Sequence, residues 1–168
     1  ILITDTISKA RNLALEVQNE PVSLDTIGRH TFRGHHKFIS PGTYSIEVYA
    51  DALVGDTTVF RSVGLALARS LGRWSGASSD GRFHVDGEAG TVRTDQSIML
   101  VDSTMFKKGF AGGYKLGDEV QEFNDPVKVS LMSYQEDQAV YQRNSDDTWI
   151  ELPSYYDQGR IVAYTDKM

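Results

Sequence analysis

The 168-residue sequence contains no cysteine. This absence excludes disulfide bonds, metal sites built from thiolates and a cysteine nucleophile. It leaves the cellular compartment open, because many secreted bacterial proteins also use no cysteine. The location of the protein must therefore be inferred from other features.

Long apolar runs and an excess of positive charge are also missing. No run approaches the ~20 apolar residues that a helix needs to cross a membrane. The chain has 17 Lys and Arg against 23 Asp and Glu, which gives a formal net charge of −6 and a pI near 5.1. Nucleic acids and anionic lipid surfaces usually require a basic face. We therefore expect no nucleic-acid partner and no membrane insertion.

The common sequence signatures of enzymes are absent as well. Ser75 is framed by glycines in GRWSGASSDG, but the spacing is not the G-x-S-x-G of a nucleophile elbow. The stretch GFAGGYKLG lacks the Gly-Lys-Ser/Thr end of a phosphate-binding loop. A glycoside hydrolase needs two carboxylates that flank a cleft, whereas the acidic residues here lie mostly at expected turns. The sequence favours a non-catalytic protein, and a hydrolase built from distant loops stays as a third alternative.

What the sequence does contain is an alternation of apolar and polar residues. In residues 43–50, Tyr44, Ile46 and Val48 alternate with other side chains, as in a strand with one buried face. Similar runs predict strands near residues 10–17, 59–68, 97–103, 126–134, 138–143, 148–152 and 159–165. A helix is the rival interpretation for residues 6–17 and 61–74, but Gly64 and Gly72 weaken the latter by ~1 kcal/mol each. The pattern predicts an all-β fold of two small antiparallel β-sandwiches in series.

A domain boundary is expected in the stretch ARSLGRWSGASSDG, where small residues interrupt the apolar pattern as in a linker. The sequence therefore predicts a first sandwich over residues 1–70, a linker over 71–79 and a second sandwich over 80–168. The chain begins at Ile1, with neither an initiator methionine nor a signal sequence, so we read it as a fragment of a larger protein.

Residues 39–63 resemble the closing hairpin of bacterial immunoglobulin-like modules, with Pro41, Gly42, Tyr44, Ala50 and Gly55 at the characteristic positions. The second half is similar to the β-sandwich shared by ankyrins, netrin receptors and zonula-occludens proteins, which also occurs in bacterial surface proteins. The matching residues are Asp80, Gly81, Phe83, Val85, Gly90, Val92, Tyr114, Leu116, Phe123, Pro126, Val127, Val140, Tyr141, Trp149, Leu152 and Pro153.

These motifs are patterns of turns and core positions, so they specify a fold far better than a function. The resemblance implies a non-catalytic structural or interaction module of a larger secreted or cell-surface bacterial protein, with no cofactor. Its expected partners are the neighbouring domains of the parent chain or another surface protein. The alternative function is a module that binds a carbohydrate or a surface polymer.

Residues 80–95, DGRFHVDGEAGTVRTD, could be a metal loop, a catalytic cluster or a run of turns. Asp80-Gly81 and Asp86-Gly87 are typical of turns, and Phe83 and Val85 alternate between them as in a strand. The stretch lacks the ladder of oxygen ligands found in EF-hand loops. We interpret it as a strand between two turns.

Four aromatic residues near expected loops, Trp74, Trp149, Tyr155 and Tyr156, are the candidates for a carbohydrate platform, because exposed rings can stack on sugar faces. Packing in the core is the competing interpretation, and Trp149 falls on a core position of the resembled sandwich.

Two groups of residues could hold a metal ion. Asp5, Asp51 and Asp56 could meet at one end of the first sandwich and bind Ca²⁺, although Asp is also common in turns. His30, His35 and His36 lie in a locally basic stretch that could bind zinc or copper. Adjacent histidines on a strand point to opposite faces, so a basic loop without metal is favoured.

Overall fold

The computed structural model describes residues 2–4, 10–28, 31–52, 57–102, 113–116, 122–144, 146 and 148–167. All regular elements in these ranges are β-strands, which confirms the predicted all-β class. In the same ranges no helix is long and apolar enough to cross a membrane. The strands are β1 (Leu2–Thr4), β2 (Ala10–Val17), β3 (Glu20–Val22), β4 (Leu24–Gly28), β5 (Thr31–Gly34), β6 (Gly42–Ala52), β7 (Thr57–Ala68), β8 (Trp74–Ala77), β9 (Phe83–Gly87), β10 (Gln96–Asp102), β11 (Tyr114–Leu116), β12 (Glu122–Met132), β13 (Val140–Arg143), β14 (Trp149–Leu152), β15 (Ser154–Asp157) and β16 (Arg160–Lys167).

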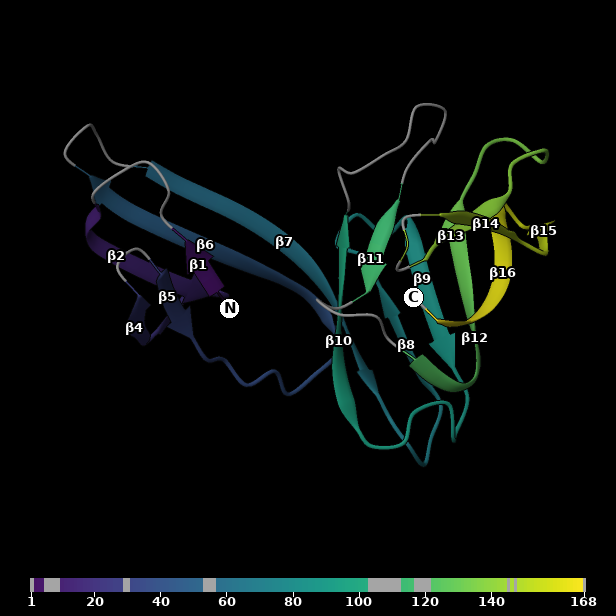
Figure 1. Cartoon of the computed structure of the whole chain (residues 1–168), viewed down its shortest axis with the longest axis horizontal. Helices are drawn as coiled ribbons and strands as arrows, with labels where there is room; N and C mark the ends of the chain where they lie inside the picture. The colour runs from purple at the N-terminus through teal and green to yellow at the C-terminus, as the bar shows by residue number, and fades with distance from the viewer. Residues whose placement is uncertain are drawn as a thin grey trace. The chain divides into compact units, whose positions relative to one another are not determined.

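These strands form four sheets, and every pairing whose register is described is antiparallel (Figure 1). The strand orders are β1-β5-β4, β11-β10-β7-β6-β2-β3, β15-β16-β12-β9-β8 and β13-β14. Strands that are consecutive in the sequence are often neighbours, as is usual for antiparallel sheets joined by hairpins.

The chain divides into two compact units. The first contains residues 1–39 and 44–62, and the second contains residues 40–43 and 63–168. The division falls within β7, between Ser62 and Val63, so it differs from the boundaries expected from the sequence. The arrangement of two sandwiches in series stays a prediction.

The first unit has a small core at the pairing of β2 with β6. Leu15, Val17 and Ile46 are buried, and Val17 lies opposite Ile46 in the ladder. Gly34 of β5 packs against Leu15, because a Cβ at Gly34 would lie only 2.5 Å from the Leu15 Cδ2 atom. The alternation that predicted β2 therefore corresponds to one buried face.

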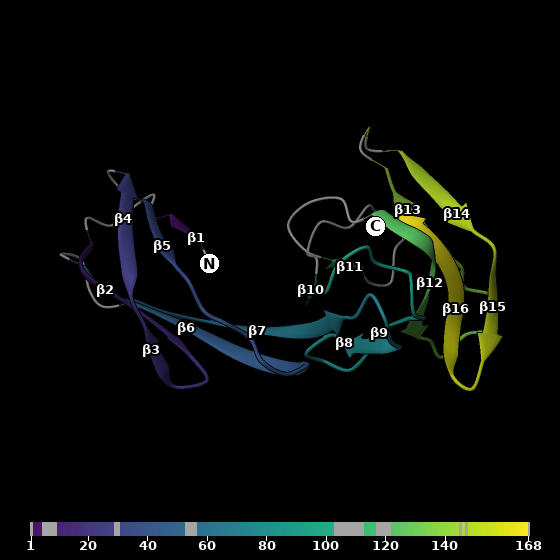
Figure 2. The same ribbon diagram turned by 90° about the horizontal axis from the view of Figure 1, so that it is seen from below.

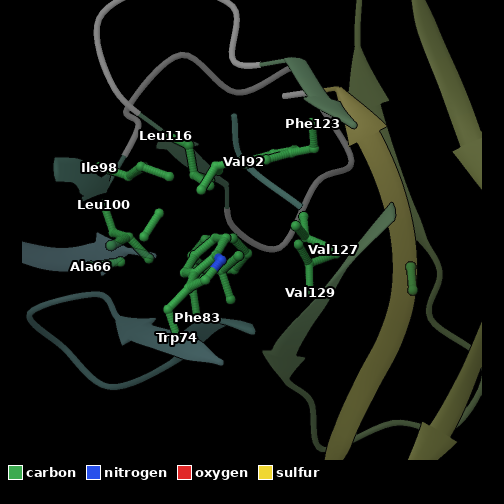
Figure 3. Close-up of a cluster of buried hydrophobic side chains, with 13 residues drawn as sticks. Ala66, Trp74, Phe83, Val92, Ile98, Leu100, Leu116, Phe123, Val127 and Val129 are labelled. Carbon is green, nitrogen blue, oxygen red and sulfur yellow. The ribbon is translucent and has the colours of Figure 1, made fainter. Parts of the chain in front are cut away.

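The second unit has a larger core, drawn in Figure 3, with Trp74 and Phe83 at its centre. A large apolar side chain stabilises the fold by about 1.5–3 kcal/mol when it is fully buried. The buried members of the cluster are Ala66, Ala68, Trp74, Phe83, Val85, Val92, Ile98, Leu100, Leu116, Phe123, Val127, Val129 and Ala163.

The segment expected to be a linker contains strand β8. Trp74 is 5% exposed, and β8 pairs along its length with β9. The small residues of this segment have a packing role, because a Cβ at Gly76 would lie 2.4 Å from the Cβ of Ala66. A composition that is typical of linkers therefore reflects a close approach between β8 and β7.

The turn at Asp80-Gly81 is confirmed, whereas the expected turn at Asp86-Gly87 is wrong. Gly81 has a φ of 70°, which favours glycine. Gly87 is instead buried as the last residue of β9, opposite Trp74 in the ladder. The glycine is needed there because a Cβ would lie 2.2 Å from the Cε2 atom of Trp74.

Candidate functional site

One face of the five-stranded sheet of the second unit gathers exposed aromatic and charged side chains. Alternate residues of β16 and β12, such as Ile161, Ala163 and Val129, are buried toward the core. The residues between them point to the opposite side of the sheet, which we call the outer face. Its members are Ser75 and Ala77 of β8, Asp86 and His84 of β9, Lys128, Ser130 and Met132 of β12, Tyr155 and Asp157 of β15, and Arg160, Val162, Tyr164 and Asp166 of β16. Figure 2 shows β12, β16 and β15 side by side.

The hairpin of β15 and β16 fixes the register of this face. Gln158 and Gly159 form the two-residue connection, with φ values of 49° and 82°. Two positive φ values are typical of a type I′ turn, whose twist matches that of the strands. The turn places Tyr155 directly opposite Val162.

The centre of the outer face is covered. Val162 is 2% exposed and Ser130 is 5% exposed, although both point away from the core of the unit. Arg160 extends across β12, where its Nε donates to the Ser130 Oγ at 2.9 Å and its Nη2 donates to the backbone oxygens of Ser130 at 3.0 Å and Arg82 at 2.8 Å. These bonds connect β16 to β12 and to the residue that precedes β9, so the face has a fixed polar centre.

Two tyrosines flank Val162 and remain open to solvent. Tyr155 is 50% exposed and Tyr164 is 52% exposed. They are diagonal neighbours on adjacent strands, a relation in which residues lie about 7–8 Å apart and aromatic side chains can meet. A hydrogen bond between the two hydroxyl groups raises the pKa of Tyr155 above its ordinary value. The two tyrosines therefore lie near each other while about half of each is exposed.

Charges of both signs surround the tyrosine pair. Burial lowers the pKa of His84, the positive charge of Arg160 lowers it further, and Asp86 partly opposes the shift. His84 is therefore mainly neutral at pH 7. Positive charge on the face comes from Lys128 and Arg160, and negative charge comes from Asp86, Asp157 and Asp166. The face thus offers hydrogen-bond donors and acceptors together.

The structure does not bring the four predicted aromatic residues together. Trp74 is in the core, where its Nε1 donates to the Thr91 Oγ1 at 2.8 Å, so it is not available as an exposed ring. Tyr156 points away from the outer face, because it follows Tyr155 on the same strand. Trp149 lies half-buried on β14, in the separate two-stranded sheet.

Tyr164 is the member of the pair that sequence reasoning missed. The alternation Arg160, Val162, Tyr164 in β16 is visible in the sequence, but it identifies a face without saying what lies beside it. Only the pairing with β15 places Tyr155 next to this face.

The predicted metal ligands can be located only in part. Asp5, Asp56 and His30 lie outside the described residues. Asp51 lies on β6, but the structure does not describe its side chain. His36 contacts the Phe38 ring edge to face, with ring centroids 4.9 Å apart. Among the residues that the structure describes, no group of three His, Asp or Glu side chains could hold a metal ion.

The acidic start of DGRFHVDG organises the turn between β8 and β9. The Asp80 Oδ1 accepts hydrogen bonds from the Ser78 Oγ at 2.5 Å and the Arg82 backbone N–H at 3.0 Å, and its Oδ2 accepts one from the Tyr114 hydroxyl at 2.7 Å. The Tyr114 ring stacks on Phe83, with ring centroids 5.0 Å apart. Partial burial alone would raise the pKa of Asp80, but these hydrogen bonds outweigh it and lower the pKa below 3.8. Asp80 is thus part of the turn.

We expect Asp80→Ala to destabilise the protein at pH 7 by about 1 kcal/mol, a modest value because solvent screens this exposed carboxylate. A carboxyl group with a lowered folded-state pKa stabilises the fold above its unfolded pKa and loses that effect as the pH falls through the folded value. The difference from the wild type should therefore shrink between pH 7 and about pH 2.5 in urea unfolding experiments. Asp166→Ala, which removes an exposed carboxylate from β16, is the matched control. A difference for Asp80→Ala that is the same at both pH values would contradict the prediction.

No family model, no curated protein sequence and no solved structure matches this chain. The resemblances to bacterial immunoglobulin-like modules and to the ankyrin-type sandwich therefore stay interpretations of the sequence motifs.

Proposed function

We propose that this chain is a non-catalytic interaction module of a larger secreted or cell-envelope bacterial protein, and that it binds its partner through the outer face. The observation that carries the proposal is the tyrosine pair, which is half exposed beside a buried Val162 on hydrogen-bonded strands. Exposed aromatic side chains on a rigid element are typical of binding surfaces. The bacterial and extracellular context is supported by the sequence motifs alone.

The roles of several carboxylates support a module without catalysis. Asp95 accepts hydrogen bonds from the Arg69 guanidinium and from the backbone and hydroxyl groups of Ser70. Asp146 accepts two hydrogen bonds from Thr148, at its backbone N–H and its hydroxyl group. Like Asp80, these carboxylates hold their own loops in place, which is a structural use of an acidic side chain.

Two kinds of partner fit this proposal. The first is a protein surface, either a neighbouring domain of the parent chain or another surface protein. The second is a carbohydrate or surface polymer, which the exposed rings of Tyr155 and Tyr164 favour, because aromatic faces stack on apolar sugar faces.

Site-specific photo-crosslinking in the full parent protein tests the proposal. We would place a benzophenone amino acid at Tyr155 or, as a control, at Tyr141 of β13, which is 40% exposed and lies outside the five-stranded sheet. We expect irradiation in the cell of origin to produce an adduct from position 155 and none from position 141. Adducts at equal levels from both positions, or none from position 155, would count against the outer face as the binding surface.

A further inference from the structure

We propose that Tyr155 and Tyr164 form a platform for the sugar rings of a neutral, hydroxyl-rich polysaccharide. This inference rests on the proposed function, because it names the partner that the outer face binds. It places the ligand on β15 and β16, between the polar centre at Arg160 and the exposed end of β16.

The two tyrosines supply the apolar part of the platform. Tyr155 lies opposite Val162 in the ladder and Tyr164 lies two residues beyond it; Val162 is buried, whereas about half of each tyrosine is exposed. They stand at diagonal positions of the β15–β16 ladder, whose register a two-residue turn fixes. Side chains on paired strands have a fixed backbone, so binding costs little backbone entropy, which favours association. Two neighbouring rings on an open sheet suit successive units of a polymer, whereas a small isolated ligand is usually enclosed in a pocket.

Charged side chains lie beside the two tyrosines. Lys128 lies next to Tyr164 on the adjacent strand, and Asp166 lies on the same face two residues beyond Tyr164. Asp157 lies two residues beyond Tyr155. An ammonium group donates hydrogen bonds and a carboxylate accepts them, and a sugar hydroxyl group does both. These residues can therefore bind hydroxyl groups at the rim of rings stacked on the tyrosines.

The balance of charge favours a neutral ligand. An acidic polymer on the tyrosine pair would approach Asp157 and Asp166, and a basic one would approach Lys128 and Arg160. Like charges brought together on binding cost free energy, whereas a neutral polyol meets partners of both kinds. His84 adds little positive charge at pH 7, because burial lowers its pKa.

Affinity electrophoresis in native gels tests the inference with soluble polymers. The neutral probes are hydroxyethyl cellulose, arabinoxylan, galactomannan and soluble starch, and the acidic probes are carboxymethyl cellulose and polygalacturonate. Hydroxyethyl and carboxymethyl cellulose share a backbone and differ in charge. We expect at least one neutral polymer to retard the protein, and we expect the retardation to be nearly independent of salt, because no net charge pairing drives it.

Matched variants locate the site. Tyr155→Ala and Tyr164→Ala should each weaken binding about tenfold, since each removes one stacking face. Tyr155→Phe keeps the ring and should retain most of the wild-type affinity. Tyr141→Ala removes a ring of similar exposure from β13 and should leave binding within about twofold of the wild type, which is the limit for a side chain outside the site. Unfolding midpoints of all variants show whether each one is folded.

The outcomes separate this inference from the proposed function. Binding to acidic polymers alone, with a strong loss in salt, would overturn the neutral ligand but keep the outer face as a binding surface. No binding to any polymer, together with a protein adduct from position 155 in the crosslinking experiment, would also overturn the inference and leave the interaction module in place. Failure of both experiments would reject both proposals. Retardation that both Tyr→Ala variants leave unchanged would place sugar binding elsewhere and contradict the inference.

Discussion

Gly64→Ala should destabilise the second unit by about 3 kcal/mol or more. A Cβ at this position would lie 1.8 Å from the backbone oxygen of Ala77 and 2.8 Å from the Cα of Ser78. Backbone atoms cannot rotate away as a side chain can, so the methyl group would have to push β8 away from β7. Gly64 also lies opposite Leu100 in the ladder with β10, and a shift would disturb that pairing. Urea unfolding followed by tryptophan fluorescence measures the effect, because both tryptophans lie in this unit.

Gly72→Ala is the matched control for this substitution. The atom nearest to a Cβ at Gly72 is the Cβ of Arg69, at 4.0 Å, which is an ordinary contact. We expect a change within about 0.5 kcal/mol, as for most substitutions outside packed regions. If both alanine variants lost the same stability, the close approach of β7 and β8 would not be the cause.

A second large effect is expected at Trp74. Trp74→Ala should cost about 3–5 kcal/mol, because it removes a large buried side chain from the centre of the core. It also removes the hydrogen bond from Nε1 to Thr91. Gly87→Ala should cost about 2 kcal/mol by itself, since its Cβ would lie 2.2 Å and 2.3 Å from the Cε2 and Nε1 atoms of the indole.

The two substitutions should not be additive. Once Trp74 is alanine, the space that the Cβ at Gly87 needs is empty, so Gly87→Ala should cost little in that background. The expected interaction energy is about 2 kcal/mol, measured in a double-mutant cycle by urea unfolding with circular dichroism detection. Gly72→Ala combined with Trp74→Ala should be additive and serves as the control cycle. Additive costs for Gly87 and Trp74 would contradict the packing of the indole over Gly87.

The longer strands could be predicted from the sequence because their periodicity comes from burial. The prediction for residues 10–17 agrees with β2, and Leu15 and Val17 are buried within it. Short strands such as β4 were missed. Within β4 (Leu24–Gly28), only Leu24 is partly buried and the other four residues are exposed. The strand therefore has no alternation of buried and exposed positions that the sequence could reveal. A short exposed strand is stabilised mainly by its pairing partner, which the sequence does not name.

The strand in the expected linker and the pair of Tyr155 and Tyr164 could not be predicted, for a related reason. Small residues occur both in exposed segments and where two backbones approach closely. Composition alone therefore does not show whether Gly76 belongs to a flexible linker or packs against Ala66. The candidate site depends on register in the same way. Tyr155 could be chosen from its sequence, but its neighbour Tyr164 is nine residues later and meets it only through the pairing of β15 with β16.

The place of β15 at the edge of its sheet also bears on self-association. An edge strand offers unpaired backbone groups to other chains and can seed edge-to-edge aggregation. Here the edge is only four residues long, it follows Pro153, which has no N–H to donate, and it ends in the charged Asp157. All three features are ways in which natural sheets block further strands from adding. The sheet can therefore carry exposed tyrosines beside its edge while its growth into larger β-assemblies is hindered.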